Sequence, residues 1–192
     1  MIPTLIGDPA MASLERFRKA AGRAAKAAAR GAGAYIPEKL RNTAYLRTFA
    51  LLRIPMMFYV APTVLESSLE RCQVVIKLNR RTKNHLGSMY FGVLAIGADC
   101  AGGLIAMRAI EEGGHDVSLV FKDFKADFLK RPESDVVFTC KDGRLIQDMI
   151  RETLETGERV SRPIRVTGTC PDKFGDEPVA EFILTLSLKK KS

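Results

Sequence analysis

Alternating apolar and polar residues mark several stretches in the later part of the chain as β-strands. In residues 72–78 the apolar side chains fall on every second position, which is the pattern of a half-buried strand. A longer alternation over residues 117–128 slips by one position after Phe121. Such a slip predicts a β-bulge that bends the strand. Shorter alternations predict three further strands, within residues 136–140, 160–166 and 180–188.

Two stretches show helical spacing instead. Residues 90–110 are apolar on most sides and lack proline, which predicts a helix that is buried all round. Residues 145–154 repeat apolar side chains at helical spacing before Gly157, a residue suited to a helix C-terminus. No strand–helix–strand unit repeats, which argues against a doubly wound parallel sheet. We therefore predict an α+β domain in which an antiparallel sheet wraps around one long central helix.

The beginning of the chain differs from the rest and divides into two segments. Residues 1–35 are a basic leader rich in Ala and Gly, expected to be helical or partly disordered. A loosely held basic helix fits this leader better than an organelle transit peptide. Residues 36–67 are apolar, and Pro55 and Pro62 predict short helices with a break near Ile54. The main domain is then residues 68–192, with segment 36–67 packed on its sheet or in weak contact with a membrane surface.

Charge and cysteine usage narrow the possible partners. The formal net charge of +8 favours anionic partners, and much of the excess lies in the leader. A phosphorylated small molecule is expected before nucleic acid. The cysteines form no C-x-x-C pair, and with two histidines no metal site is predicted. Without a secretory signal, we expect a cytoplasmic protein with buried, reduced thiols at Cys72, Cys100, Cys140 and Cys170.

Asp99 is the single acidic residue in the middle of the apolar helix. Burial of an unpaired carboxylate is costly and raises its pKa, which makes it a better base. Such an acid has either a chemical task or a structural partner, such as a nearby hydroxyl or backbone amide. The helix is also long enough to span a membrane, but Asp99 near its centre and the flanking strands argue against that interpretation.

The residues from Asn84 to Asp99 resemble the signature of the hotdog thioesterase superfamily, in particular its phenylacetate-degradation branch and uncharacterised relatives. In that pattern an Asn and a Gly precede a His-Gly-Gly run, and an acid follows the His by nine residues. Asn84, Gly87, Gly92 and Asp99 match in register, whereas Tyr90 replaces the His and Phe91 replaces the next Gly. The element order resembles the same fold from about Ser68 onward.

This resemblance implies a thioester hydrolase whose active sites lie between two subunits of a homodimer, or of a dimer of dimers. The backbone amides of Tyr90, Phe91 and Gly92 would stabilise the oxyanion, and Asp99 of the partner chain would act as base or nucleophile. Asn84 would fix the loop or orient the water. The substrate is expected to be acyl-CoA, with no separate cofactor. Contacts to the substrate are expected from Gly87, Ser88 and Ser118.

Several alternatives remain open at this level. His85 could act as the base, although a lone loop histidine is more often a surface or capping residue. A protein that binds acyl-CoA or lipid without hydrolysis is the second hypothesis, motivated by the departures at Tyr90 and Phe91. An interaction or membrane-surface protein that uses the basic leader is the third. The chain lacks the G-x-S-x-G elbow of serine hydrolases.

Overall fold

The computed structural model describes residues 37–191, so the leader predicted at residues 1–35 lies outside the described residues. The chain divides into two compact units after Phe58. The first contains α2 (Glu38–Arg53), and the division falls within α3 (Pro55–Val60). The predicted break is confirmed, since Ile54 leaves the helical conformation with φ −137° and ψ 78°. Pro55 then begins a new helix, as proline does readily at a first helical position.

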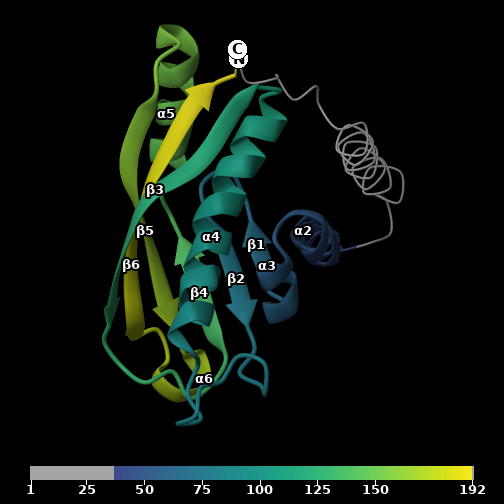
Figure 1. The fold of residues 1–192 in the computed structure, drawn as a ribbon, viewed down its shortest axis with the longest axis vertical. Helices are drawn as coiled ribbons and strands as arrows, with labels where there is room; N and C mark the ends of the chain where they lie inside the picture. The colour runs from purple at the N-terminus through teal and green to yellow at the C-terminus, as the bar shows by residue number, and fades with distance from the viewer. Residues whose placement is uncertain (1–36, 192) are drawn as a thin grey trace, which may run out of the picture. The chain divides into compact units, whose positions relative to one another are not determined.

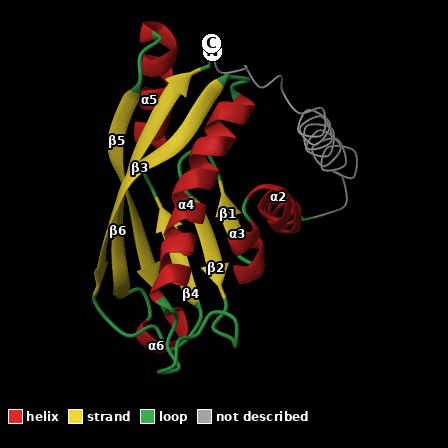
Figure 2. Cartoon of the chain, viewed as in Figure 1, coloured by secondary structure: helices red, strands yellow, loops and turns green. Residues whose placement is uncertain are grey.

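The second unit is a six-stranded antiparallel sheet with one long helix along it (Figures 1 and 2). The strand order is β1-β2-β4-β5-β6-β3, so β1 and β3 are the two edges. The long helix α4 (Phe91–Glu112) falls between β2 and β3 in the chain, and α5 (Gly143–Thr156) and α6 (Pro171–Phe174) connect later strands. The strands are β1 (Thr63–Ser67), β2 (Cys72–Ile76), β3 (Val117–Phe128), β4 (Val136–Cys140), β5 (Val160–Thr169) and β6 (Pro178–Lys190).

Small residues let α4 approach the sheet closely. A Cβ atom on Gly97 would lie 2.3 Å from the ring of Phe138, and one on Gly102 would lie 2.8 Å from Ile164. The helix has the length and hydropathy of a membrane span, but most of its apolar stretch is buried inside the protein. Its apolar circumference is therefore explained by the sheet that covers it.

Most of the predicted elements are confirmed. The sheet register shifts between Phe121 and Phe124, which is the expected bulge. Gly157 ends α5 with φ +72°, a left-handed conformation that glycine adopts without strain. The prediction was wrong for Thr63–Ser67, which we expected within the helical segment 36–67. These residues form β1 and pair with β2, so the sheet begins before Ser68.

Candidate active site at the central helix

The first turn of α4 presents backbone donors without an internal partner. Tyr90 is the N-cap residue, and no side chain caps this end of the helix. The amides of Val93 and Leu94 both donate to the Tyr90 carbonyl oxygen. Within residues 37–191, no hydrogen bond is made by the N–H groups of Phe91 and Gly92, which point out of the helix end. Two amides and the positive end of the helix dipole therefore converge at this tip.

One predicted donor is already occupied. The Tyr90 N–H donates to the carbonyl oxygen of Thr82 at 2.8 Å, so it is not free for a ligand. The prediction that amides 90 to 92 all face the substrate is therefore wrong for Tyr90 in this structure. The Tyr90 ring packs against Phe91 with centroids 4.7 Å apart, and it lies where a Cβ on Gly92 would stand, 2.6 Å away. A side chain at position 92 would therefore displace the exposed Tyr90 ring.

Asn84 organises the loop that precedes the helix. Its Oδ1 accepts hydrogen bonds from the amides of Leu86 (2.9 Å) and Ser88 (3.3 Å), and its Nδ2 donates to Ser88 Oγ (3.1 Å). Gly87 turns the loop with φ +81°. Of the two predicted roles for Asn84, fixing the loop is the one that the geometry favours. Ser88 is only 4% exposed in this chain and its contact with substrate stays a prediction, while His85 is exposed on the same loop.

Asp99 lies half-buried in the middle of α4. No hydrogen bond or ion pair to its carboxylate occurs in the described part of the chain. Burial raises its pKa above the ordinary value of 3.8. A Cβ on Gly103, one turn later, would stand 3.9 Å from both Asp99 Oδ1 and the Phe121 ring. The carboxylate and the Phe121 ring thus flank the same position on α4, and no ion pair stabilises the carboxylate in the described part of the chain, which suits a base.

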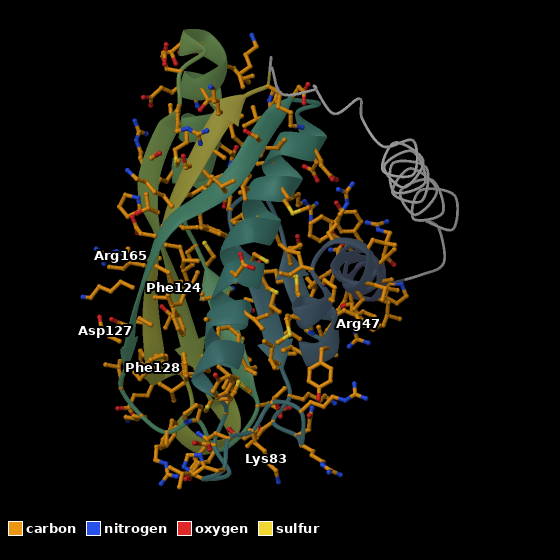
Figure 3. The ribbon with its side chains drawn as sticks, in the orientation of Figure 1. Arg47, Lys83, Phe124, Asp127, Phe128 and Arg165 are labelled. Atoms are coloured by element: carbon orange, nitrogen blue, oxygen red, sulfur yellow. The ribbon has the colours of Figure 1, made fainter. Side chains whose placement is uncertain are left out.

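A band of phenylalanines extends from beneath α4 to the edge strand. Phe138, under Gly97, contacts Phe182 with centroids 6.1 Å apart, and Phe182 contacts Phe124 (5.8 Å) and Phe128 (6.4 Å) on β3. Phe182 is fully buried, whereas Phe124 and Phe128 are 44% and 52% exposed. Figure 3 labels these two side chains on β3. The band provides an apolar surface that continues from the core to the outside.

Ser118 is not part of this arrangement. Its hydroxyl donates to the Lys189 carbonyl oxygen at 3.0 Å, near the end of β6. Phe121 faces α4, so the alternation of β3 turns Ser118 to the opposite face of the sheet. The contact of Ser118 with substrate stays a prediction, and it would be made from the face of β3 opposite Phe121.

The cysteines near Asp99 are poor nucleophiles. Burial raises the pKa of Cys72 to about 12 and that of Cys140 to about 11, and burial also raises the pKa of Cys100. A thiol in this state stays protonated at neutral pH and reacts slowly. Among residues 37–191, no group of His, Cys, Asp or Glu is placed to hold a metal ion. Asp99 is therefore the group best suited to proton transfer near this helix.

Three cationic residues lie on the loop that leads into α4, and the sequence alone did not single them out. Residues 71–98 contain no Asp or Glu, yet Arg80, Arg81 and Lys83 lie exposed on the loop before the helix. The hydrogen bond from the Tyr90 N–H to Thr82 holds this loop against the helix end. The backbone of Lys83 also forms an isolated antiparallel β-bridge with that of Met89. Figure 3 shows Lys83 at the end of the unit where α4 begins. An anionic ligand at the helix tip would meet positive charge on this loop.

A surface hollow of about 370 Å³ lies away from these groups, between the start of β2 and α5. Several of the charged residues that line it already have partners. Arg144 pairs with Glu70 at 3.5 Å, and Asp142 accepts a hydrogen bond from the Arg165 amide at 2.6 Å. This hollow lacks both Asp99 and the helix tip, so we do not place the active site there.

Comparison with known proteins supports the fold. The family model described as a domain of unknown function, DUF4442, matches residues 42–180. A protein of unknown function from Chlorobaculum tepidum is 12% identical, with a TM-score of 0.67 over 80% of this chain and 97% of that one. A Pseudomonas aeruginosa protein described as a probable thioesterase is 18% identical, with a TM-score of 0.66 over 81% and 97%.

A thioesterase from Haemophilus influenzae is 16% identical, with a TM-score of 0.56 over 76% of this chain and 90% of that one. At such identities the likeness establishes the fold alone, and the predicted hotdog fold is confirmed. No curated protein sequence matches this chain significantly.

Proposed function

The chain belongs to the DUF4442 family, and from that premise we propose that it hydrolyses acyl thioesters, with acyl-CoA as substrate and Asp99 as general base. The observation that carries the proposal is the combination on α4 of a half-buried, unpaired carboxylate and two unpartnered amides. Structural neighbours described as thioesterases share the fold and support the same reaction class.

The proposed reaction uses groups that the helix already carries. Asp99 removes a proton from water, and the hydroxide attacks the thioester carbonyl carbon. The N–H groups of Phe91 and Gly92 stabilise the negative charge that develops on the carbonyl oxygen. The tetrahedral intermediate then expels the thiolate, which takes up the proton held by Asp99. The products are a carboxylic acid and the free thiol, and no additional cofactor is required.

The helix geometry favours a site built from two chains. Gly92 and Asp99 are separated by seven residues, which is about 10 Å along a helix axis. A water that is hydrogen-bonded to the carboxylate and within attack distance of the carbonyl carbon separates these two groups by only roughly 6 Å. The free amides also point away from Asp99, which increases the separation. Amides of one chain and Asp99 of its partner would therefore act on one carbonyl.

The edge strand β3 supports a homodimer. It is a long, unpaired edge with exposed apolar residues, including Val120 at 51% and Phe128 at 52% exposure. Such an edge is a template for pairing with another chain, and a two-fold axis would pair β3 with its copy. The exposed phenylalanines on β3 would then line an acyl site at the seam between two subunits.

Coenzyme A is the proposed carrier because its phosphates suit the cationic loop. The side chains of Arg80 and Lys83 are exposed, form no ion pair within residues 37–191, and lie in a stretch without carboxylates. Arg81 stacks over the Tyr59 ring at 5.5 Å, which holds its charge in a fixed position. Charge-assisted bonds to phosphate are among the stronger polar contacts available to such a site.

The first test compares Asp99→Asn with Asp148→Asn on purified protein. Asp148 is an exposed carboxylate on α5, paired with Arg151 at 2.8 Å, and it is the matched control. The Asp99 variant should remain folded and lose about a thousandfold in acyl-CoA hydrolysis, since a positioned base contributes on that scale. The Asp148 variant should match the wild type. Unchanged turnover in the folded Asp99 variant would eliminate the assigned role.

The second test asks whether the site needs two chains. Differently tagged Asp99→Asn and Phe91→Pro chains are co-expressed, and the mixed dimers are purified through both tags. One of the two sites in each mixed dimer keeps both its amides and its carboxylate, so about half of the wild-type activity per dimer should return. A site contained in one chain would give no recovery. A protein from which no mixed dimer can be isolated would also contradict the two-chain site.

The third test addresses the carrier. Replacing Arg80 and Lys83 by Ser should raise KM for acyl-CoA by roughly tenfold, because two phosphate contacts are lost. The same variant should treat an acyl-pantetheine, which has no nucleotide phosphates, like the wild type. Replacing Lys141 and Arg144 by Ser removes the same charge elsewhere and should leave both substrates unaffected. Equal effects on both substrates would contradict phosphate binding by the loop.

A non-hydrolytic acyl-CoA binder is the second candidate, and the aromatic tip of α4 favours it. Phe91 is 61% exposed and packs on Tyr90 beside the free amides, where a thioester would have to approach. A stable complex with intact acyl-CoA, measured by calorimetry and mass spectrometry, would identify this function. Rapid release of free thiol would exclude it.

A further inference from the structure

One face of α2 is apolar and exposed. Leu40, Ala44 and Leu51 are spaced by four and seven residues, which places them along one side of the helix. Leu40 is 59% exposed and Leu51 is 54% exposed. This side is distinct from the one that carries the buried residues Leu46 and Ala50. Large aliphatic side chains on a surface face of a helix indicate a surface for binding.

Exposed apolar side chains also occur beyond the break at Ile54. Ile54 is 39% exposed, and Met56 and Phe58 of α3 are 63% and 42% exposed. These residues follow Leu51 directly in the chain, so five large apolar side chains gather within residues 40–58. We call Leu40, Leu51, Ile54, Met56 and Phe58 the apolar face of the N-terminal segment.

The same part of the chain holds nearly all of the excess positive charge. Residues 1–60 contain ten of the thirty Lys and Arg residues but only three of the twenty-two Asp and Glu residues. Their net charge is therefore +7 of the chain's +8, and residues 61–192 are almost neutral at +1. The charge is concentrated where the apolar face lies in the sequence.

We infer that the apolar face, together with the basic charge of residues 1–60, binds the surface of an anionic lipid bilayer. Apolar side chains enter the boundary between headgroups and acyl chains, while cations bind the anionic headgroups. Nucleic acid fits less well, because the phosphate backbone gives no favourable environment to Leu, Met and Phe side chains. A second copy also fits less well, because two segments of charge +7 repel each other.

The test measures binding of the full chain to vesicles by flotation. Vesicles of phosphatidylcholine alone are compared with vesicles in which a quarter of the lipid is phosphatidylglycerol. Binding should be at least roughly tenfold tighter to the anionic vesicles and should weaken in high salt, as electrostatic surface binding does. Equal binding to both vesicle types, or no binding to either, would overturn the inference. Neither result would bear on thioester hydrolysis, which is assayed without lipid.

A matched pair of variants separates vesicle binding by the apolar face from nonspecific binding by any exposed apolar side chain. Replacing Leu51 and Met56 by Ser should weaken anionic-vesicle binding by about tenfold. Replacing Leu86 and Leu129 by Ser removes side chains of similar exposure, 60% and 52%, from the second unit and should leave binding unchanged. The Leu51 and Met56 variant should hydrolyse a short, soluble acyl-CoA at the wild-type rate. Equal losses of vesicle binding in both variants would contradict the assignment.

Two further measurements exclude other occupants of the apolar face. Fluorescence anisotropy with a single-stranded oligonucleotide should detect weaker binding than that to anionic vesicles. Light scattering should give the same molar mass for the wild type and for the Leu51 and Met56 variant. Tighter oligonucleotide binding, or a loss of assembly in that variant, would replace the lipid surface with nucleic acid or with a second copy.

Discussion

The first turn of α4 and the middle of α4 differ in almost every property except their secondary structure. The first turn begins with the exposed Phe91, has no side-chain cap within the described residues and carries two unpartnered amides beside an aromatic pair. The middle is buried, rich in glycine and packed on Phe138, with Asp99 as its one ionisable carboxylate. The comparison shows how one helix can present hydrogen-bond donors at its tip and keep a carboxylate in apolar surroundings. The predictions below test whether these two regions are as separate as the structure suggests.

Of the changes considered next, the one at the tip of α4 should have the largest effect. Phe91→Pro removes one amide donor, and Tyr90 already has the extended conformation (φ −66°, ψ 137°) that a following proline requires. We expect kcat/KM for acyl-CoA to fall by about a hundredfold, as on loss of one oxyanion donor. Phe91→Ala keeps the amide and removes the same ring, so it should retain most of the activity. Equal losses in both variants would assign the effect to the ring.

The next effect concerns packing in the middle of the helix. Gly97→Ala places a methyl group 2.3 Å from the Phe138 ring, so the ring or the helix has to move. We expect the free energy of unfolding to fall by about 2 to 3 kcal/mol. Gly103→Ala gives only ordinary contacts at 3.9 Å, and because alanine favours a helix interior over glycine it should raise stability by about 0.5 to 1 kcal/mol. Urea denaturation measures both, and equal stabilities would contradict the close approach at Gly97.

The pH dependence of activity tests the environment of Asp99. Burial raises its pKa above 3.8, and the base works only when it is ionised. Activity should therefore fall as the pH falls through this raised value, so the acid limb of kcat/KM lies above the ordinary range for aspartate. The residual activity of Asp99→Asn should lack that limb. A limb at or below pH 3.8 would indicate a solvated carboxylate or a different base.

The smallest expected effect is the change of stability with pH that ionisation of Asp99 causes. The folded protein binds the Asp99 proton more tightly than the unfolded chain, so stability decreases as pH rises from 3.8 through the raised pKa. Asp99→Asn has no charge to bury, and it should be more stable than the wild type at neutral pH. The difference should disappear below pH 3.8. Thermal unfolding across this range measures it, and a less stable variant at neutral pH would reveal a partner for the carboxylate.

Periodicity predicted the large elements well because each of them buries a face. The bulge in β3, the ends of α5 and the break at Ile54 all follow from local patterns of apolar residues, glycine and proline. The strand β1 was missed because five residues after Pro62 are too few to show a period. Its apolar residues also follow directly on the apolar helical segment, so the sequence shows no change of pattern where the strand begins.

The sequence analysis missed some details of the site because they depend on contacts between separate turns of the chain. It missed the orientation of Ser118 because the alternation along β3 was not used to assign its face. The bond that occupies the Tyr90 amide comes from Thr82, in a turn whose shape no periodicity describes. The burial of Ser88 follows from the same folded loop. The facing of Ser118 was predictable, because the alternation that directs Phe121 inward directs Ser118 outward.

The strand order has a consequence for how the chain is made. β6 follows the other five strands in the chain, yet it lies inside the sheet, between β5 and β3. During synthesis β3 therefore has no strand to pair with, and its apolar side chains stay exposed, until residues 178–190 have left the ribosome. Pairing between strands so distant in the chain is slow and leaves the nascent chain open to aggregation. Synthesis that stops before β6 would release a sheet divided into two pieces.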